Sequence, residues 1–268
     1  MNMTDLCCRD SVKRTRLKSW TVYHDDGVTP ASVLEAIESG GEILKSSKKS
    51  RVHRIGDWVV KMAGGSWLSR IIRLTFKKAR YRRGWFAANH LVAHEVGCPV
   101  PIAYAERSLL GLIFQHALVS VYLEEERNVE VFSRALIQRG GSQDTFSMYL
   151  SKLAMAVNAL TASGAFHGDL SGKNIFTRDG ESFRFIDLDS IEIGVEYTEA
   201  MRLKNHVQLY DSFCDDMNDA LLVPFLKAML PASIDPRVWM PKVRKAQEVR
   251  RHKTEEKWAK QGRSGSSG

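Results

Sequence analysis

The chain has 268 residues, of which 44% are hydrophobic and 26% charged, and its formal net charge is +8. This is the composition of an ordinary globular protein, and the length allows either one two-lobed unit or two small domains. Apolar runs around residues 109–114 and 220–230 are too short and too interrupted to span a bilayer, and the polar N-terminus shows no secretory signal. Four cysteines without a C-x-x-C spacing predict reduced thiols in a cytoplasmic protein and no zinc site.

The positive charge predicts an acidic partner or substrate, such as nucleic acid, an anionic lipid surface or a phosphorylated sugar. Basic residues cluster at 13–18, 45–54, 70–83 and 242–260. Residues 67–83 interleave apolar and basic side chains, a pattern that a lipid-surface helix and an ordinary packed helix with a solvated basic face both show. No recognised nucleic-acid-binding motif accompanies the charge, so we expect no nucleic acid partner.

The first half of the chain predicts a sheet with one or two helices, after an N-terminal arm without periodicity. Short alternating segments predict strands at residues 20–23, 42–45, 51–55, 58–62, 102–107 and 110–118. A short helix is expected at 30–38, with Thr29 as its cap and Pro30 at its first position. A second helix is expected to run through residues 85–96 and to end at Gly97.

The second half predicts mainly helices. The strongest is residues 145–163, where apolar side chains recur on one face and Gly164 follows the last turn. Further helices are expected at 129–139, 197–217 and 218–230, the last interrupted by Pro224.

One segment between these helices places polar side chains at a spacing suited to chemistry. Asp169 is followed by Asn174 five residues later and by Asp187 thirteen residues after that. Residues 175–188 read as a two-strand hairpin with Asp-Gly at its turn, which would return Asn174 and Asp187 to the same end.

Three converging oxygen-bearing side chains suit a hard cation such as Mg²⁺. In phosphoryl transfer, one Asp orients the acceptor hydroxyl and takes its proton, while an Asn and a second Asp hold metal on the nucleotide. The alternative is a buried histidine, a turn and an acidic hairpin without a catalytic role. Each residue alone favours that alternative, whereas the joint spacing favours phosphoryl transfer.

The run His167-Gly168-Asp169, followed by Asn174 and Asp187, resembles the H-x-D-x-x-x-x-N catalytic loop and the metal-binding segment of the protein-kinase-like fold. Ile186-Asp187-Leu188-Asp189, in place of Asp-Phe-Gly, is similar to the bacterial kinases that phosphorylate Kdo or heptose in the lipopolysaccharide core. More loosely, the chain resembles aminoglycoside and choline kinases. The resemblance covers roughly residues 44–188.

The resemblance implies ATP and Mg²⁺ as cofactors and assigns roles to individual residues. Asp169 would be the base, Asn174 and Asp187 would bind the metal, and Lys61 would steady the ATP phosphates. A glycine-rich loop is missing from the first turn, where donors could instead come from Ser46, Ser47 and Lys48. Lys173 lies where related enzymes keep a basic residue near the γ-phosphate. The alternatives are a strand-end lysine for Lys61 and a solvated loop lysine for Lys173.

The sequence departs from the kinase pattern at the acid that usually holds the strand lysine. That acid is a Glu on the following helix, but Asn89 and His90 occupy this region, and Glu95 near the helix end is the remaining candidate. We expect His167 to brace the loop and Asp189 either to bind a second metal or to brace the loop.

These features predict an α+β, two-lobed protein-kinase-like fold, with a small β-rich N-lobe and a mainly helical C-lobe. The expected divisions are a flexible arm at 1–19, the N-lobe at 20–123, the C-lobe at 124–250 and a basic, low-complexity tail at 251–268. The predicted function is ATP-dependent phosphorylation of heptose or Kdo in the lipopolysaccharide inner core, by a peripheral protein on the cytoplasmic face of the inner membrane, where the basic stretches meet anionic lipid. The alternatives are a small-molecule or protein kinase of the same fold and a catalytically inactive, membrane-associated binding module.

Overall fold

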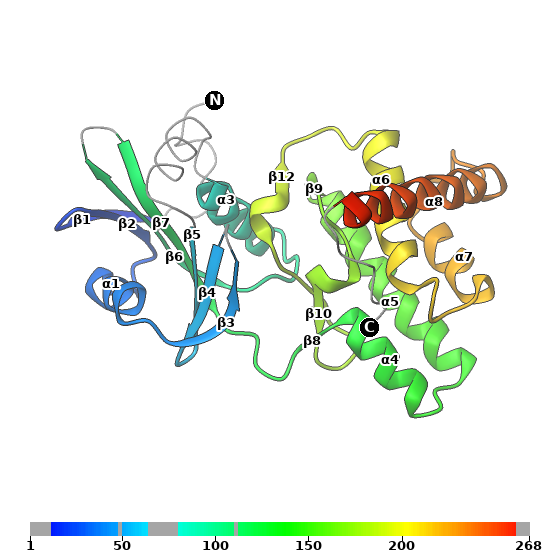
Figure 1. Ribbon diagram of the computed structural model, residues 1–268, viewed down its shortest axis with the longest axis horizontal. Helices are drawn as coiled ribbons and strands as arrows, with labels where there is room; N and C mark the ends of the chain where they lie inside the picture. Colours follow the sequence, from blue (N-terminus) through cyan, green and yellow to red (C-terminus); the bar gives the residue numbers. More distant parts are fainter. Residues whose placement is uncertain (1–11, 48–49, 64–79, 110–111, 261–268) are drawn as a thin grey trace. The chain divides into compact units, whose positions relative to one another are not determined.

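The computed structural model describes residues 12–47, 50–63, 80–109 and 112–260 (Figure 1). Lys48, most of the basic stretch at 67–83 and the end of the predicted tail therefore lie outside the described residues. The chain divides into two compact units. The first comprises Met1–Glu126, Ser163–Phe166 and Arg184–Val195, and the second comprises Arg127–Ala162, His167–Phe183 and Glu196–Gly268.

The first unit is built on an antiparallel sheet of seven strands in the order β1-β2-β6-β7-β5-β4-β3. Its strands are β1 (Lys13–Leu17), β2 (Trp20–His24), β3 (Glu42–Ser46), β4 (Ser50–Ile55), β5 (Trp58–Ala63), β6 (Pro101–Leu109) and β7 (Leu112–Val121). Strand alternation separates two sets of buried side chains, because neighbouring residues point to opposite faces. Val60 and Val119 pack with helix α1 (Pro30–Ser39), whereas Leu118 packs with Tyr81 and Trp85 of helix α3 (Arg80–Ala93). The two helices therefore cover opposite faces of the sheet (Figure 1).

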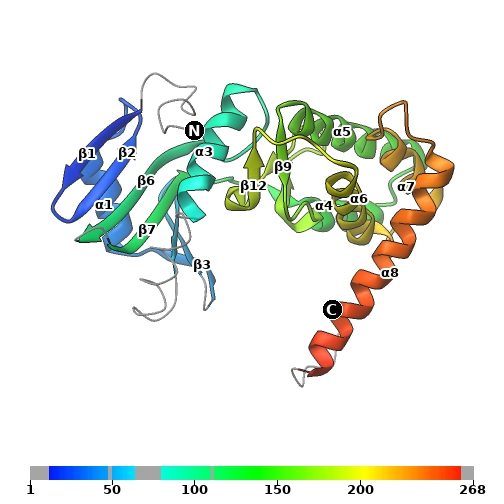
Figure 2. The same ribbon diagram turned by 90° about the horizontal axis from the view of Figure 1, so that it is seen from above.

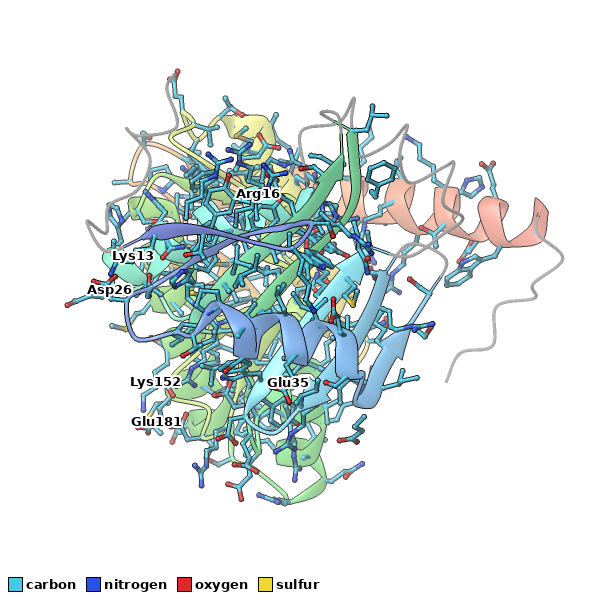
Figure 3. All side chains as sticks on the ribbon, turned by 90° about the vertical axis from the view of Figure 1, so that its left-hand side faces the viewer. Lys13, Arg16, Asp26, Glu35, Lys152 and Glu181 are labelled. Carbon is cyan, nitrogen blue, oxygen red and sulfur yellow. The ribbon has the colours of Figure 1, made fainter. Side chains whose placement is uncertain are left out.

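Residues 13–17, expected to belong to the flexible arm, instead form the edge strand β1, which pairs with β2 from Lys13 opposite His24 to Leu17 opposite Trp20. The expectation was wrong because Leu17 is the only apolar residue of this strand, so the segment shows almost no alternation of apolar and polar side chains. A charged edge strand of this kind discourages pairing with other chains. Lys13 also forms an ion pair with Asp26 at 2.8 Å (Figure 3).

Helix α3 includes the predicted segment from Trp85 onward but stops earlier than expected. It ends at Ala93, and Glu95 takes a left-handed backbone conformation with a φ of 56°, which a continuing helix does not allow. The turn therefore comes before Gly97, the residue expected to end the helix.

The second unit is mainly helical. Its helices are α4 (Val129–Gln138), α5 (Gln143–Ala162), α6 (Glu199–Phe213), α7 (Asp219–Lys227) and α8 (Pro236–Lys260). Helix α5 buries the face that the sequence predicted, including Phe146, Leu150 and Leu153. Helix α8 continues to Lys260, so residues 251–260 of the predicted tail are helical, and Figure 2 shows this end of α8 extending past α6 and α7. Among the described helices, none combines the length and the apolar character needed to cross a bilayer.

A buried histidine links α6 to α8. His206 is 2% exposed, and its Nδ1 accepts a hydrogen bond from the indole Nε1 of Trp239 at 2.9 Å. Burial, with a smaller effect of Arg202, lowers the pKa of His206 to about 3. The imidazole is therefore neutral in the folded protein at neutral pH.

This pKa makes stability depend on pH. The unfolded chain takes up a proton at this residue below about pH 6.5 and the folded chain does not, so stability falls as the pH is lowered. Between about pH 7.5 and 5.5, we expect the free energy of unfolding to drop by about 1.4 kcal/mol through His206. Urea unfolding of the wild type and of His206→Gln at both pH values measures this. An equal drop in both proteins would contradict it.

Candidate active site

The loop after strand β9 (Ala165–His167) holds Asp169 next to Asn174 in the second unit. The side-chain Nδ2 of Asn174 donates to the backbone oxygen of Asp169 at 2.9 Å and to its carboxylate Oδ2 at 3.0 Å. A 3₁₀ turn at Gly172–Asn174 brings the amide back to the loop, which is why a spacing of five residues suffices. Because the amide nitrogen faces Asp169, its oxygen is the atom left to face a cation.

The loop is also held by His167, which is fully buried. Its Nδ1 accepts a hydrogen bond from the backbone N–H of Asp169 at 3.1 Å. This contact agrees with the bracing role predicted for His167. Lys173 lies on the same loop, and its side chain is exposed.

Helix α6 supplies a second set of contacts that sequence reasoning missed. Gln208 accepts from the N–H of Leu170 at 3.0 Å, and its amide donates to Asp169 Oδ1 at 3.4 Å. Asn205 donates to the backbone oxygen of His167 at 2.8 Å. A signal existed in the sequence, since Asn205, Gln208 and Ser212 recur at helical spacing and so share one face of α6.

Ser212 completes this polar face. Its Oγ accepts from the N–H of Gly172 at 2.8 Å and donates to the backbone oxygen of Gln208 at 2.9 Å. Gly172 has no room for a side chain, because a Cβ there would lie 2.6 Å from Cγ of Glu130 in α4 and 3.1 Å from Cβ of Ser212 in α6. Loop and helix are thus packed closely enough to hold Asp169 in one orientation.

In the first unit, Lys61 of β5 contacts two carboxylates. Its Nζ lies 2.6 Å from Oδ1 of Asp187 and 2.5 Å from Oδ1 of Asp189. Arg80, at the start of α3, contacts Asp189 through its Nε and lies 3.8 Å from Asp187. Two cations and two carboxylates therefore form one compact group, which we call the Lys61 cluster.

Asp187 starts a 3₁₀ turn at Leu188–Ser190 with a left-handed backbone, φ 57° and ψ 44°. This shortens the predicted strand at 183–188 to β11 (Arg184–Phe185), because the backbone leaves the extended conformation at Asp187. The Oγ of Ser190 donates to Oδ2 of Asp187 at 2.7 Å. Burial by itself raises the pKa of Asp187, but the charge of Lys61 and hydrogen bonds from Lys61 and Ser190 outweigh it and lower the pKa to about 2.

Glu95, the candidate partner of Lys61, is not that partner. It is exposed beyond the end of α3, whereas the carboxylates on Lys61 are those of Asp187 and Asp189. The partner was missed because both acids lie more than 120 residues from Lys61 in the chain (126 and 128 residues).

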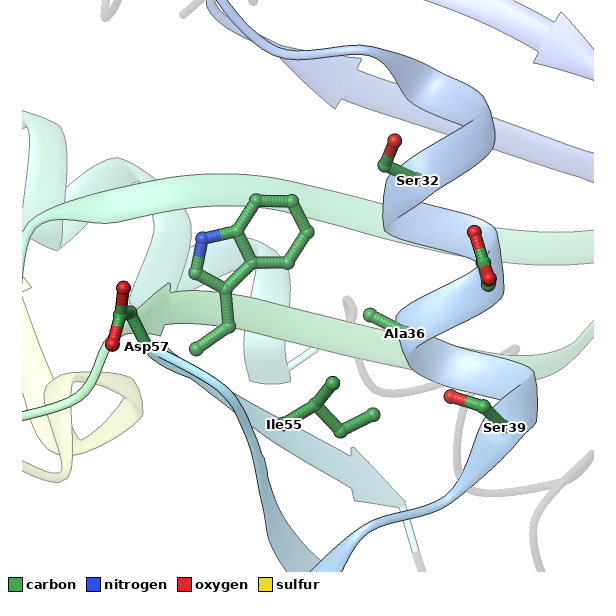
Figure 4. Close-up of a pocket in the computed structure, with 7 residues that line it drawn as sticks. Ser32, Ala36, Ser39, Ile55 and Asp57 are labelled. Carbon is green, nitrogen blue, oxygen red and sulfur yellow. The ribbon is translucent and has the colours of Figure 1, made fainter.

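Ser46 and Ser47 lie where β3 ends and the turn to β4 begins, and both are exposed. Ser47 Oγ donates to the backbone oxygen of Ser50 at 3.1 Å. A hollow elsewhere in the first unit suits phosphates poorly, because its side chains are acidic, apolar or neutral (Figure 4). It is lined by Ser32, Glu35, Ala36, Ser39, Ile55, Asp57 and Trp58.

The predicted site residues therefore form two groups. Lys61 and Asp187 lie together in the first unit, and Asp169, Lys173 and Asn174 lie together in the second. Each group offers an oxygen of the kind that Mg²⁺ prefers: the first has the ionised carboxylate of Asp187, and the second has the hard, neutral amide oxygen of Asn174. Within the described residues, no cluster of three or more His, Cys, Asp or Glu offers a metal site of another kind.

A model of the lipopolysaccharide kinase (Kdo/WaaP) family matches residues 38–225. The chain belongs to this family. The matched region includes Lys61, Asp169, Asn174 and Asp187, the residues on which the resemblance was drawn, and the prediction of the family is confirmed. Membership makes the chain a kinase, and therefore a phosphotransferase.

This chain is similar to a solved structure of WaaP in complex with acyl carrier protein, at 20% identity. The match covers 85% of this chain and 93% of that one, with a TM-score of 0.62, and it confirms the predicted α+β kinase-like fold. Two structures of WbdD, one titled a bifunctional kinase-methyltransferase, match at 15% and 14% identity and a TM-score of 0.42. They cover 76% and 87% of this chain and 49% and 53% of their own, and add nothing to the fold assignment. No curated protein matches the chain.

Proposed function

We propose that this family member uses ATP and Mg²⁺ to phosphorylate a hydroxyl of heptose or Kdo in the lipopolysaccharide inner core. Support comes from the family, whose described activity is that of a lipopolysaccharide kinase. The observation that carries the proposal is the ionised Asp187 held beside Lys61, together with Asp169 bound to Asn174. These are the charges and donors that phosphoryl transfer from a nucleotide needs.

Asp169 is the proposed base. It would accept the proton of the sugar hydroxyl as the sugar oxygen bonds to the γ-phosphorus and the bond between that phosphorus and the bridging oxygen of ADP breaks. The hydrogen bonds from Asn174 and Gln208 fix both carboxylate oxygens, so the carboxylate is oriented before the substrate arrives. This orientation matters for catalysis, because a positioned base accelerates a reaction by about 10²–10⁴-fold.

Lys61 is proposed to hold the ATP phosphates, with Asp187 and the amide oxygen of Asn174 as ligands of Mg²⁺. When bound, the metal neutralises charge on the phosphates. Ser46, Ser47 and Lys48 would donate to phosphate oxygens in place of a glycine-rich loop, and Lys173 would lie near the γ-phosphate. All of these are roles that the family resemblance suggests.

The basic surface supports a proposed location at the cytoplasmic face of the inner membrane. Lys13, Arg14, Arg16 and Lys18 follow one another along and just after β1, and all are exposed. An anionic membrane carrying the glycolipid substrate would attract such a surface.

The function can be tested by incubating the protein with γ-labelled ATP, Mg²⁺ and enzymatically dephosphorylated core lipopolysaccharide. We expect labelled glycolipid, with none formed when EDTA removes the metal. Acceptors ending in Kdo or carrying heptose, supplied separately, identify the sugar. Transfer to soluble sugars or proteins but not to glycolipid would indicate a kinase for another acceptor, and nucleotide binding without turnover would indicate an inactive binding module.

A further inference from the structure

The inference concerns the acid that holds Lys61, and it rests on the proposed function. In the protein-kinase-like fold this acid is a Glu on the helix that packs against the sheet. Here, α3 is that helix, and the residues of α3 that face the Lys61 cluster are Arg80, Tyr81 and Gly84. None of them is an acid.

Gly84 explains how an acid reaches Lys61 by another route. A Cβ at this position would lie 3.2 Å from the backbone nitrogen of Asp189 and 3.3 Å from Cδ2 of Leu118. Glycine weakens a helix interior, so its presence in the second turn of α3 fits a need for close approach. The helix backbone packs directly on the 3₁₀ turn at Leu188–Ser190, and the turn carries the carboxylate that the helix lacks.

The two acids of the cluster differ in accessibility. The side chain of Asp189 is 1% exposed, with Oδ1 on Lys61 and Oδ2 on Arg80. The side chain of Asp187 is 25% exposed and shares Lys61 with it. A buried carboxylate with a cation on each oxygen is poorly placed to bind metal, whereas Asp187 can exchange Lys61 for another cation.

We infer that Asp189 is the positioning residue for Lys61, in place of the helix Glu of other kinases. Asp189 keeps the ammonium group in place when Asp187 turns to the metal, and Arg80 balances the remaining charge of Asp189. Without Asp189, Lys61 and Arg80 would compete for Asp187, and the ammonium group would no longer be held for the phosphates.

A double-mutant cycle tests this assignment with four proteins: wild type, Asp189→Asn, Lys61→Met and the double variant. The readouts are the Kd of a fluorescent ATP analogue with Mg²⁺ and kcat/KM for ATP. In the wild-type background, we expect Asp189→Asn to raise the Kd and to lower kcat/KM, each by about tenfold to a hundredfold. A coupling of this size is typical of charged side chains in contact. In the Lys61→Met background, the same change should have almost no effect.

If Asp189 were only a structural residue or a metal ligand, Asp189→Asn would reduce ATP affinity and kcat/KM equally in both backgrounds, and that result would overturn the inference. Wild-type values of both quantities for Asp189→Asn would also overturn it. Thermal unfolding of the four proteins shows whether each variant is folded. The double variant should melt higher than Asp189→Asn, because it removes one of the two cations that would otherwise share the single carboxylate of Asp187. Asp211→Asn is the matched control, since Asp211 is a partly buried carboxylate on Arg250 and Arg251 in the second unit.

Failure of the proposed function would give a different experimental result from failure of the inference. In that case the cycle in ATP affinity would keep its coupling while no phosphate reached the glycolipid. If phosphate reached the glycolipid and the cycle showed no coupling, the function would stand and the inference would fall.

Discussion

Asp169→Asn should lower kcat for transfer to core glycolipid by about 10²–10⁴-fold, because it removes the group proposed to accept the hydroxyl proton. Asparagine has nearly the same shape and can still accept the hydrogen bond from Asn174, and it loses only the longer contact from Gln208 at 3.4 Å, so the loop should keep its structure. The Kd for ATP should change little. Initial rates with labelled ATP at saturating acceptor, together with a nucleotide-binding titration, measure the two effects separately.

The matched control is Asp179→Asn. Asp179 lies ten residues further along, and its pKa is lowered by backbone hydrogen bonds from Ser182 and Glu181 in the turn. Its loss should leave the rate close to that of the wild type. A variant at residue 169 that transfers phosphate as fast as the wild type would remove Asp169 from the mechanism.

Asp187→Asn should lower kcat/KM for ATP by at least about a hundredfold, since a metal-bound phosphate gains several kcal/mol of stabilisation in the transition state. Raising the Mg²⁺ concentration should restore part of the activity, because a neutral amide binds the ion more weakly than a carboxylate does. Rates measured across a Mg²⁺ titration test both statements. Asp216→Asn is the control, because Asp216 has a similar exposure (27%, against 25% for Asp187) and pairs with Arg134 at 2.8 Å. A Mg²⁺ requirement identical to that of the wild type would rule Asp187 out as a ligand.

The low pKa of Asp187 determines the pH range in which its carboxylate is charged. With a folded pKa of about 2, below its ordinary value, the carboxylate stabilises the folded state above about pH 4 and loses this contribution as the pH falls through 2. Asp187 therefore stays ionised throughout the range in which the enzyme can be assayed. Any fall in activity between about pH 7 and 5 has to come from other groups.

Several features were predictable because neighbouring residues decide them. The apolar face of α5 and the turn at 178–180 follow from spacing and turn chemistry within a few residues. The bond between Asp169 and Asn174 also closes over five residues, so the motif could be recognised without knowing the fold. The strand β1 escaped notice because its sequence, Lys-Arg-Thr-Arg-Leu, carries hardly any apolar alternation.

The sequence by itself therefore determined the family, the β-rich and helical halves and the close pairing of Asp169 with Asn174, since each depends on short spacings along the chain. Only the tertiary structure decided which groups surround them. Asp189 reaches Lys61 because the strand order brings β5 under α3 and because Gly84 lets α3 approach the turn. Asn205 and Gln208 reach the loop because α6 packs against it. Contacts between residues so far apart depend on how whole elements pack, and no local pattern encodes that distance.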